Sequence, residues 1–245
     1  MSDSIVLIPT YNEKENIEAI IRAVFALSVP FHILVIDDNS PDGTAAIVKG
    51  LQNEFTESLF LLERPGKQGL GRAYMAGFEW ALAHNYDLVY EMDADFSHNP
   101  NDLVRLRQAC LDGADVAVGS LYVSGVNVVN WPMGRVLMSY FASKYVRFVT
   151  GLPVADTTAG FKCYKKEVLQ TIEMDKIRFV GYAFQIEMKF TAYKCGFKIT
   201  EVPIIFVNRE LGTSKMSGGI FSEALLGVIK LKWRSLFRKY PQKGK

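Results

Sequence analysis

The stretch "YDLVYEMDAD" (86–95) joins a short apolar run to a cluster of acidic side chains. The run is typical of a strand buried in a sheet. Glu91, Asp93 and Asp95 then stand close together where that strand ends. Like charges repel, and burying a charge costs free energy. The stretch is therefore either a solvated acidic loop or a site for a divalent cation.

The same arrangement recurs along the chain. Four more apolar, strand-like runs are "IVLIPT" (5–10), "FHILVIDD" (31–38), "SLFLLER" (58–64) and "ADVAVGSLY" (114–122). Between them lie helical segments, such as residues 15–27, whose apolar positions follow the three-to-four spacing of an amphipathic helix. Strands alternating with helices in short connections predict an α/β fold with a mostly parallel central sheet flanked by helices.

Composition limits the domain organisation. The chain has 245 residues, of which 49% are hydrophobic and 22% charged, as expected for one large globular domain. Seven of its 28 basic residues follow Glu223, whereas all 26 acidic residues lie at or before it. We predict a catalytic domain over 1–216 and a basic, amphipathic helix and tail over 217–245.

The predicted location is the cytoplasm. Cys110, Cys163 and Cys195 show no metal-binding spacing and fit reduced, buried thiols. The start "MSDSIVLIPT" has neither the basic region nor the long apolar stretch of a signal peptide. No window is apolar enough for a spanning helix. Residues 136–149 and 220–240 mix apolar with basic positions, so peripheral contact with the cytoplasmic face of an anionic membrane is expected. The alternative is that these helices pack on the domain or form an oligomer interface.

Polar clusters follow four of the predicted strands, and in open α/β sheets ligands bind at that edge. Asp93 and Asp95 can turn toward one hard cation, which prefers oxygen ligands and could neutralise a nucleotide diphosphate. Asp38 could accept hydrogen bonds from a nucleobase or ribose, or it could belong to a turn. Neither a dinucleotide fingerprint nor a P-loop motif is present.

A basic segment, "RELGTSK" (209–215), could bind the phosphates. Its Arg209 and Lys215 are natural partners for diphosphate oxygens, although a solvated loop is an equal alternative. Arg135 has the same ambiguity, because it opens a predicted helix and could be a surface charge.

Six motifs together resemble family 2 glycosyltransferases of the GT-A fold, and among them most closely the polyprenyl-phosphate (dolichyl-phosphate) mannose synthases. They are "PTYNE", "VIDDNSPDGT", "GLGRAY", "DADFSHNP", "GYAFQIEM" and "VPIIFVNRELGTSK". The resemblance spans roughly residues 4–216, and the joint order of the motifs makes it specific. It implies a GDP-mannose donor, Mg²⁺ or Mn²⁺, a polyprenyl phosphate acceptor and a single inverting displacement. No nucleic-acid partner is expected.

The resemblance also implies roles for individual residues. The guanosine part would be held by Pro9, Tyr11, Glu13, Ile36 and Asp38. Metal and diphosphate would be held by Asp93 and Asp95, with the backbone of Ala94 and with Ser97 near the metal. Arg209 and Lys215 would bind phosphates, Arg135 would meet the acceptor phosphate, and Asp156 would lie on the acceptor side. Independently of the resemblance, the alternation along the strand places Glu91 on the same side as Asp93, as a structural or supporting carboxylate. His98 is expected to be only a loop residue.

One position departs from the pattern. Relatives tend to carry arginine where this chain has Leu121, and leucine cannot bind phosphate. Either another cation compensates, for which Arg135 is the candidate, or activity and sugar preference differ. The alternatives to mannose transfer are therefore a polyprenyl-phosphate glucosyltransferase that uses UDP-glucose, and a catalytically impaired nucleotide-binding homologue.

Overall fold

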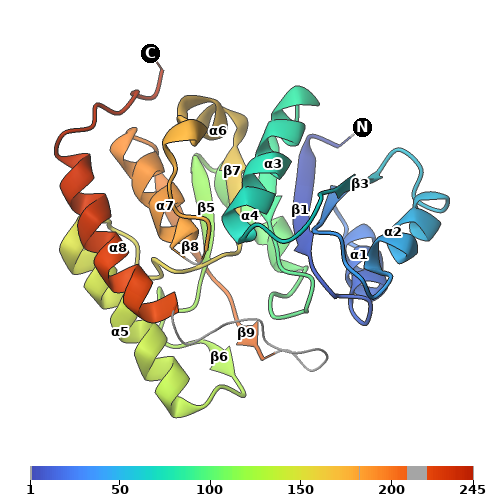
Figure 1. The fold of residues 1–245 in the computed structure, drawn as a ribbon, viewed down its shortest axis with the longest axis horizontal. Coiled ribbons are helices and arrows are strands. Elements are labelled where there is room, and N and C mark those ends of the chain that lie inside the picture. The colour runs from blue at the N-terminus through green and yellow to red at the C-terminus, as the bar shows by residue number, and fades with distance from the viewer. Residues whose placement is uncertain (1, 182, 209–219, 245) are drawn as a thin grey trace.

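A seven-stranded sheet with the order β3-β2-β1-β4-β7-β5-β8 forms the centre of the computed structural model, which describes residues 2–181, 183–208 and 220–244 (Figure 1). Its parallel strands are β1 (Ser4–Thr10), β2 (His32–Asp37), β3 (Leu59–Glu63), β4 (Leu88–Glu91), β5 (Val116–Ser120) and β8 (Ile199–Pro203). The predicted mostly parallel α/β sheet is confirmed. One strand, β7 (Lys162–Lys165), is antiparallel and lies between β4 and β5.

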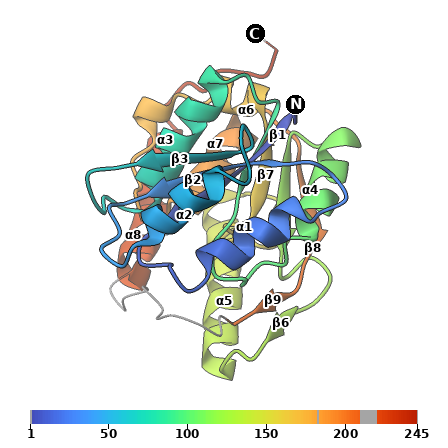
Figure 2. The same ribbon diagram turned by 90° about the vertical axis from the view of Figure 1, so that its right-hand side faces the viewer.

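Helices cover both faces of this sheet. On one face α1 (Ile17–Phe25), α2 (Thr44–Gln52) and α4 (Asp102–Leu111) pack against the side chains of Val6 and Ile8. On the other, α3 (Leu70–Ala83), α6 (Lys166–Thr171) and α7 (Phe184–Lys194) pack against Ile5 and Leu7. Figure 2 shows α1 and α2 in front of the strands. Alternate residues of β1 thus serve opposite cores, which explains why a buried strand reads as a continuous apolar run.

The glycine-rich segment before α3 is tightly held. Gly69 has φ +99°, and a Cβ atom there would lie 2.7 Å from the carbonyl oxygen of Val180. The N–H of Gly71 donates to that same oxygen at 2.8 Å. The backbone that begins α3 is therefore held in place by this contact. Only glycine permits this close approach of backbone to backbone.

Two long helices lie side by side at the β8 end of the sheet: α5 (Met133–Thr150) and α8 (Ile220–Ser235) (Figure 1). The hydroxyl of Tyr145 donates to the carbonyl of Leu225 at 2.9 Å, and Nζ of Lys232 donates to that of Thr150 at 3.2 Å. A small core of Val146, Ile186, Phe190, Val228 and Leu231 joins the two helices to α7. The boundary predicted between residues 216 and 217 lies outside the described residues.

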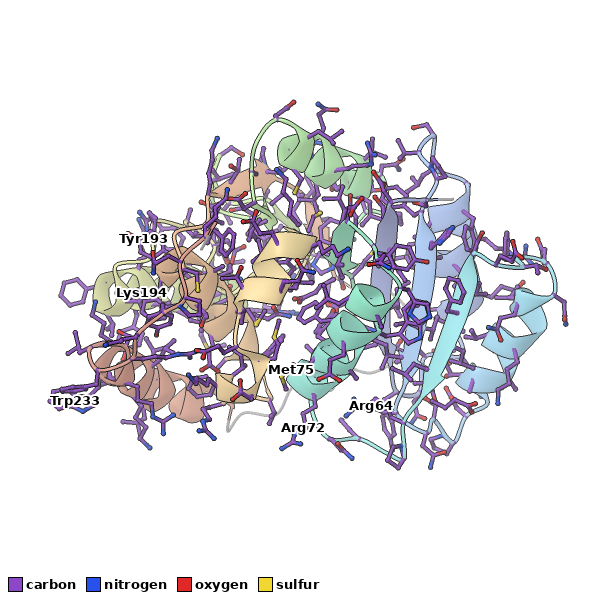
Figure 3. All side chains as sticks on the ribbon, turned by 90° about the horizontal axis from the view of Figure 1, so that it is seen from above. Arg64, Arg72, Met75, Tyr193, Lys194 and Trp233 are labelled. Atoms are coloured by element: carbon purple, nitrogen blue, oxygen red, sulfur yellow. The ribbon has the colours of Figure 1, made fainter. Side chains whose placement is uncertain are left out.

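The outer sides of α5 and α8 are apolar and exposed. We call this surface the helical apolar face; its side chains are those of Met133, Leu137, Met138, Phe141, Phe148, Leu225, Leu226, Ile229, Trp233, Leu236 and Phe237. Phe148 is 89% exposed and Trp233 is 65% exposed. In Figure 3 Trp233 points away from the body of the molecule. The helices thus pack on the domain with one side and leave a large apolar surface on the other. Exposed patches of this kind mark interaction sites.

Three shorter elements complete the fold. Strands β6 (Val128–Val129) and β9 (Phe206–Val207) form a small parallel sheet near the carboxyl ends of the main strands. A 3-10 helix, η1 (Met174–Lys176), precedes α7. All three cysteines are free and buried, as predicted.

Candidate active site

The carboxyl ends of β1, β2, β4 and β5 meet at one edge of the sheet, because these strands are parallel. The polar clusters predicted after β1, β2 and β4 therefore converge there. We call this region the acidic edge; it comprises residues 10–13, 37–40, 91–98 and 120–122. The side chains of these clusters differ in role: some only stabilise the loops through hydrogen bonds, whereas others could contact a ligand.

Asp37 is a brace. Its carboxylate accepts hydrogen bonds from the Thr10 hydroxyl at 2.9 Å and from the backbone N–H and hydroxyl of Ser40 at 2.8 and 2.6 Å. Asp42 similarly accepts from the N–H of Thr44 at 3.0 Å, in the turn predicted there. The loop after β1 is tied to the loop after β2, because the N–H of Asn12 donates to the Ser40 hydroxyl and that of Lys14 to Asp42, each at 3.0 Å.

Asp38 forms an ion pair that local sequence patterns did not reveal. Nη1 of Arg64, directly after β3, lies 2.8 Å from Oδ1 of Asp38, and both side chains are 9% exposed. Burial raises the pKa of Asp38, and the Arg64 guanidinium opposes that rise. The backbone N–H of Gln68 also contacts this carboxylate. A carboxylate has about four lone-pair sites, so it could still accept a hydrogen bond from a nucleoside hydroxyl or amide.

The remaining predicted nucleoside residues differ in accessibility. Pro9 is half-buried. Nζ of Lys67 lies over the ring of Tyr11, 5.1 Å from the ring centre. Glu13 is buried and accepts from the side-chain amide of Asn16 at 3.2 Å. The side chain of Ile36 is fully buried in the core under α3. Only the backbone of Ile36 could contribute to a nucleoside pocket, so a side-chain contact from this residue is excluded.

The Asp93 and Asp95 pair follows β4 as predicted. The Asp93 side chain is 45% exposed, whereas Asp95 and Ala94 are buried. Oδ1 of Asp95 accepts the backbone N–H of Ser97 at 3.0 Å. Between them Phe96 has φ +58°, an unusual conformation for a bulky residue. The backbone is therefore bent so that Ser97 turns back toward the Asp95 carboxylate.

His98 was predicted to be only a loop residue, and this was wrong. It is 5% exposed, its ring stacks on Phe161 with centroids 4.8 Å apart, and its Nδ1 lies 3.9 Å from Oδ2 of Asp93. Burial lowers the pKa of His98 to about 4, against the attraction of Asp95. A neutral imidazole thus packs beneath the acidic pair, and Phe206 of β9 covers its edge.

Glu91 is a structural carboxylate. It is completely buried, its Oε2 lies 3.1 Å from Nζ of the equally buried Lys162, and Gln185 donates to it at 2.7 Å. Nζ of Lys162 also donates to the side-chain oxygen Oε1 of Gln185. Burial lowers the pKa of Lys162, and Glu91 opposes that change. One of the three crowded acids is thus neutralised within the core.

Asp156 supports the loop after β5. Its Oδ2 accepts the backbone N–H of Leu121 at 3.0 Å, and its Oδ1 accepts the Thr158 hydroxyl at 3.1 Å. Glu201 of β8 in turn accepts the N–H groups of Ala155 at 2.7 Å and Asp156 at 2.9 Å. Burial raises the pKa of Asp156, against the hydrogen bond from Leu121. The side chain of Leu121 is buried in the core, so this segment offers its backbone rather than a cation.

Arg135 lies on the first turn of α5. Its guanidinium stacks on the Trp131 ring, with 4.0 Å between Cζ and the ring centre, and donates to the side-chain oxygen of Asn208 at 3.2 Å. Stacking holds the guanidinium plane in place near residues that follow β9. The predicted phosphate ligands Arg209 and Lys215 lie outside the described residues.

The oxygen donors present fit a hard divalent cation, though they do not enclose one. Among residues 2–181, 183–208 and 220–244, no group of three or more histidine, cysteine or acidic side chains could hold a metal ion by itself. Asp93, Asp95 and Ser97 lie within the segment 93–97 after β4 and carry oxygen atoms of the kind that such a cation prefers. The remaining coordination positions would be left to a phosphate ligand and water.

Comparisons with known proteins agree with this geometry. The chain matches the family described as Glycosyl transferase family 2 over residues 5–173. It is 46% identical over 227 residues to the polyprenol monophosphomannose synthase of Mycolicibacterium smegmatis, covering 93% of this chain and 86% of that protein. It is 43% identical over 236 residues to the undecaprenyl-phosphate mannosyltransferase of Micrococcus luteus, covering 95% and 96%.

Solved structures share the fold. Glucosyl-3-phosphoglycerate synthase of Mycobacterium tuberculosis, in complex with Mn²⁺, UDP and glucosyl-3-phosphoglycerate, matches 93% of this chain and 78% of its own, with a TM-score of 0.66 at 18% identity. The mannosyltransferase PcManGT of Pyrobaculum calidifontis, in complex with GDP-Man and Mn²⁺, matches 98% and 66%, with a TM-score of 0.62 at 17% identity.

Proposed function

Since the chain belongs to glycosyl transferase family 2, we propose that it transfers mannose from GDP-mannose to a polyprenyl phosphate. The observation that carries this proposal is the match over nearly the whole chain to two mannosyltransferases named for polyprenol or undecaprenyl-phosphate. The acidic edge supports it, because a nucleotide diphosphate needs both a cation site and a nucleoside pocket there. GDP-Man bound to one structural neighbour is consistent with the donor.

Asp93, Asp95 and Ser97 would hold Mg²⁺ or Mn²⁺. Both structural neighbours described above contain Mn²⁺. When bound, the cation offsets the repulsion between the two carboxylates and the negative charge of the diphosphate. The guanosine part would lie against Pro9, Tyr11, Glu13 and Asp38, and the backbone of Ile36.

The reaction is a single inverting displacement. An oxygen of the acceptor phosphate attacks the anomeric carbon, the bond from that carbon to the diphosphate oxygen breaks, and GDP leaves with the electron pair. The acceptor is already anionic at neutral pH, so no side chain needs to remove a proton. Arg135 would orient the acceptor phosphate, and Arg209 and Lys215 would bind the diphosphate. Asp156 would position the loop after β5, because hydrogen bonds occupy both of its oxygens.

A lipid acceptor requires contact with a membrane, and the helical apolar face is our candidate for that contact. No helix among the described residues is both long and apolar enough to cross a bilayer. Lys144, Lys230 and Lys239 add basic groups to the same helices and the tail that follows. We place the protein as a peripheral enzyme on the cytoplasmic face, where anionic lipids attract basic segments.

A transfer assay tests the reaction. Purified protein is offered GDP-mannose, UDP-glucose or UDP-GlcNAc with polyprenyl phosphate, each with Mg²⁺ and with excess EDTA. We expect labelled lipid from GDP-mannose only, and none with EDTA. Product from UDP-glucose alone would show a glucosyltransferase instead. Nucleotide binding without transfer from any donor would show a catalytically impaired homologue.

A further inference from the structure

A half-open cavity of about 400 Å³ lies between α8, α7 and the segment after η1. Four cationic side chains line it: Lys176 and Arg178 from one wall, and Arg234 and Arg238 from the other. Its volume suits a small ligand or a headgroup. We call it the basic pocket. It is built by elements other than those that carry the acidic edge.

The protein balances the charges of the basic pocket only in part, because two acids, Glu173 and Glu187, act on its four cations. Glu173 pairs with Lys176 at 2.5 Å and with Arg238 at 3.4 Å, and so engages those two cations. In the described part of the chain, the guanidinium groups of Arg178 and Arg234 make no hydrogen bond or ion pair. Two arginines on opposite walls are thus available to one anion.

The acid inside the basic pocket has another partner. Oε2 of Glu187 accepts the backbone N–H groups of Arg178 and Phe179, each at 2.8 Å. That carboxylate therefore fixes the wall that carries Arg178, instead of pairing with a guanidinium at close range. The Nε atom of Arg238 is buried without a hydrogen-bond partner among the described residues, while its guanidinium lies 4.8 Å from the Tyr240 ring centre.

Two cations of the basic pocket are neighbours in sequence of aromatic residues of the helical apolar face. On α8 and its extension, Arg234 follows Trp233, and Arg238 follows Phe237. Both aromatic side chains are largely exposed. An amphipathic helix with this arrangement places its apolar side among acyl chains and its cations at the level of the headgroups.

We propose that the basic pocket binds the phosphate of an anionic phospholipid headgroup when α8 lies on a membrane. Paired guanidinium groups are suited to phosphate oxygens, which they can bind bidentately. The adjoining apolar face selects a lipid phosphate over free phosphate, because only the lipid also supplies acyl chains for Trp233 and Phe237. This inference rests on the membrane contact proposed above. It adds a lipid site separate from the one for the polyprenyl phosphate substrate.

Matched double variants test the basic pocket. R178Q/R234Q removes two cations that line it, and K230Q/K239Q removes two exposed cations of α8 and the tail that do not line it. Binding is measured by co-sedimentation with vesicles of phosphatidylcholine alone, and of phosphatidylcholine with phosphatidylglycerol. Two surface charges contribute a general attraction of about 1 kcal/mol each, so both doubles should bind anionic vesicles more weakly. We expect R178Q/R234Q to lose at least about tenfold more affinity than K230Q/K239Q, a difference of about 1.4 kcal/mol. On phosphatidylcholine alone the two should bind alike.

The outcomes separate this site from the wider proposal. Equal losses in the two doubles would overturn the basic pocket and leave peripheral membrane binding intact. If wild-type protein bound neither kind of vesicle, both ideas would fail. In a last experiment, inorganic phosphate replaces chloride at constant ionic strength. One result would be that phosphate stabilises the wild-type protein but not R178Q/R234Q, while the two doubles bind vesicles equally. That result would identify a free-phosphate site and overturn the lipid assignment.

Discussion

The acidic edge and the helical apolar face are built in opposite ways. At the acidic edge, strand ends and short loops fix carboxylates such as Asp37 and Asp95 through hydrogen bonds. On the helical apolar face, α5 and α8 expose large side chains that make few specific contacts. A small charged ligand is bound by fixed groups at fixed distances, whereas a lipid surface is bound by area. The two regions should therefore respond differently to substitution.

Asp95→Ala should give the largest difference between the responses of the acidic edge and the helical apolar face. Loss of this carboxylate removes an oxygen ligand and should lower transfer by roughly 1,000-fold or more, because stabilising the departing diphosphate is worth several kcal/mol. Excess EDTA should do the same to the wild-type protein. Vesicle binding should not change. The readouts are radiolabelled lipid formation and co-sedimentation, with the exposed Asp112→Ala as control. Near wild-type transfer by Asp95→Ala with metal present would refute the metal assignment.

Lys162→Met should have the next largest effect, on stability. It leaves Glu91 buried without its cation, which typically costs about 3–5 kcal/mol. Lys49→Met is the matched control, because Lys49 pairs with Glu63 at 2.8 Å on the surface, where such a pair is worth about 0–1 kcal/mol. Chemical denaturation measures both. Similar losses in the two variants would mean that the buried pair does not support β4 as described here.

Lys162 also shows where sequence reasoning stops. The position of Asp93 and Asp95 could be predicted because it depends on one strand and its end. Lys162 reaches Glu91 only because β7 enters the sheet antiparallel between β4 and β5, and no local pattern encodes that order. A lysine inside the apolar stretch "AGFKCY" (159–164) was the available signal of a buried ion pair.

The same limit applies to other parts of the acidic edge. Arg64 meets Asp38 across two neighbouring strands, and Glu201 meets the 155–156 loop from the far side of β5. His98 was misjudged because Phe161 and Phe206, distant in sequence, fold over it. The sequence predicted which polar side chains follow each strand. It did not predict the contacts that depend on the order of the strands in the sheet.

Trp233→Ala combined with Phe237→Ala tests the other side of the comparison. Removing two exposed aromatic side chains from the helical apolar face should weaken vesicle binding by about tenfold or more, since each can bury apolar area worth more than about 1 kcal/mol. The donor affinity, measured by GDP-mannose titration, should stay constant. Leu111→Ala, at an exposed apolar position at the end of α4, is the control. Unchanged vesicle binding would show that this face serves another partner.

Glu201→Gln should have a smaller and more selective effect. Glutamine keeps one acceptor oxygen but turns an N–H₂ group toward a backbone N–H, so one hydrogen bond to the 155–156 loop is lost. At about 1 kcal/mol, this should raise the KM for polyprenyl phosphate about fivefold and leave that for GDP-mannose unchanged. Asp115→Asn is the control, because Asp115 accepts the N–H of Lys198 at 2.8 Å at the opposite end of β5. Equal KM changes for both substrates would indicate general loosening instead of acceptor positioning.

The smallest expected effect is a pH dependence of binding to anionic vesicles. Burial raises the pKa of Glu187 above its ordinary value, while its hydrogen bonds to Phe179 and Arg178 oppose the rise. As pH falls through that raised pKa, Glu187 loses its charge, whereas the four cations of the basic pocket stay charged. A hydrogen bond from Lys176 lowers the pKa of Glu173, which therefore stays ionised longer. The pocket becomes more positive, so wild-type binding should strengthen about twofold or more toward acid pH.

Glu187→Gln should bind more tightly near neutral pH and show a flatter profile than the wild type. A profile as steep as that of the wild type would assign the pH dependence to the rest of the protein surface and remove Glu187 from the charge balance of the pocket.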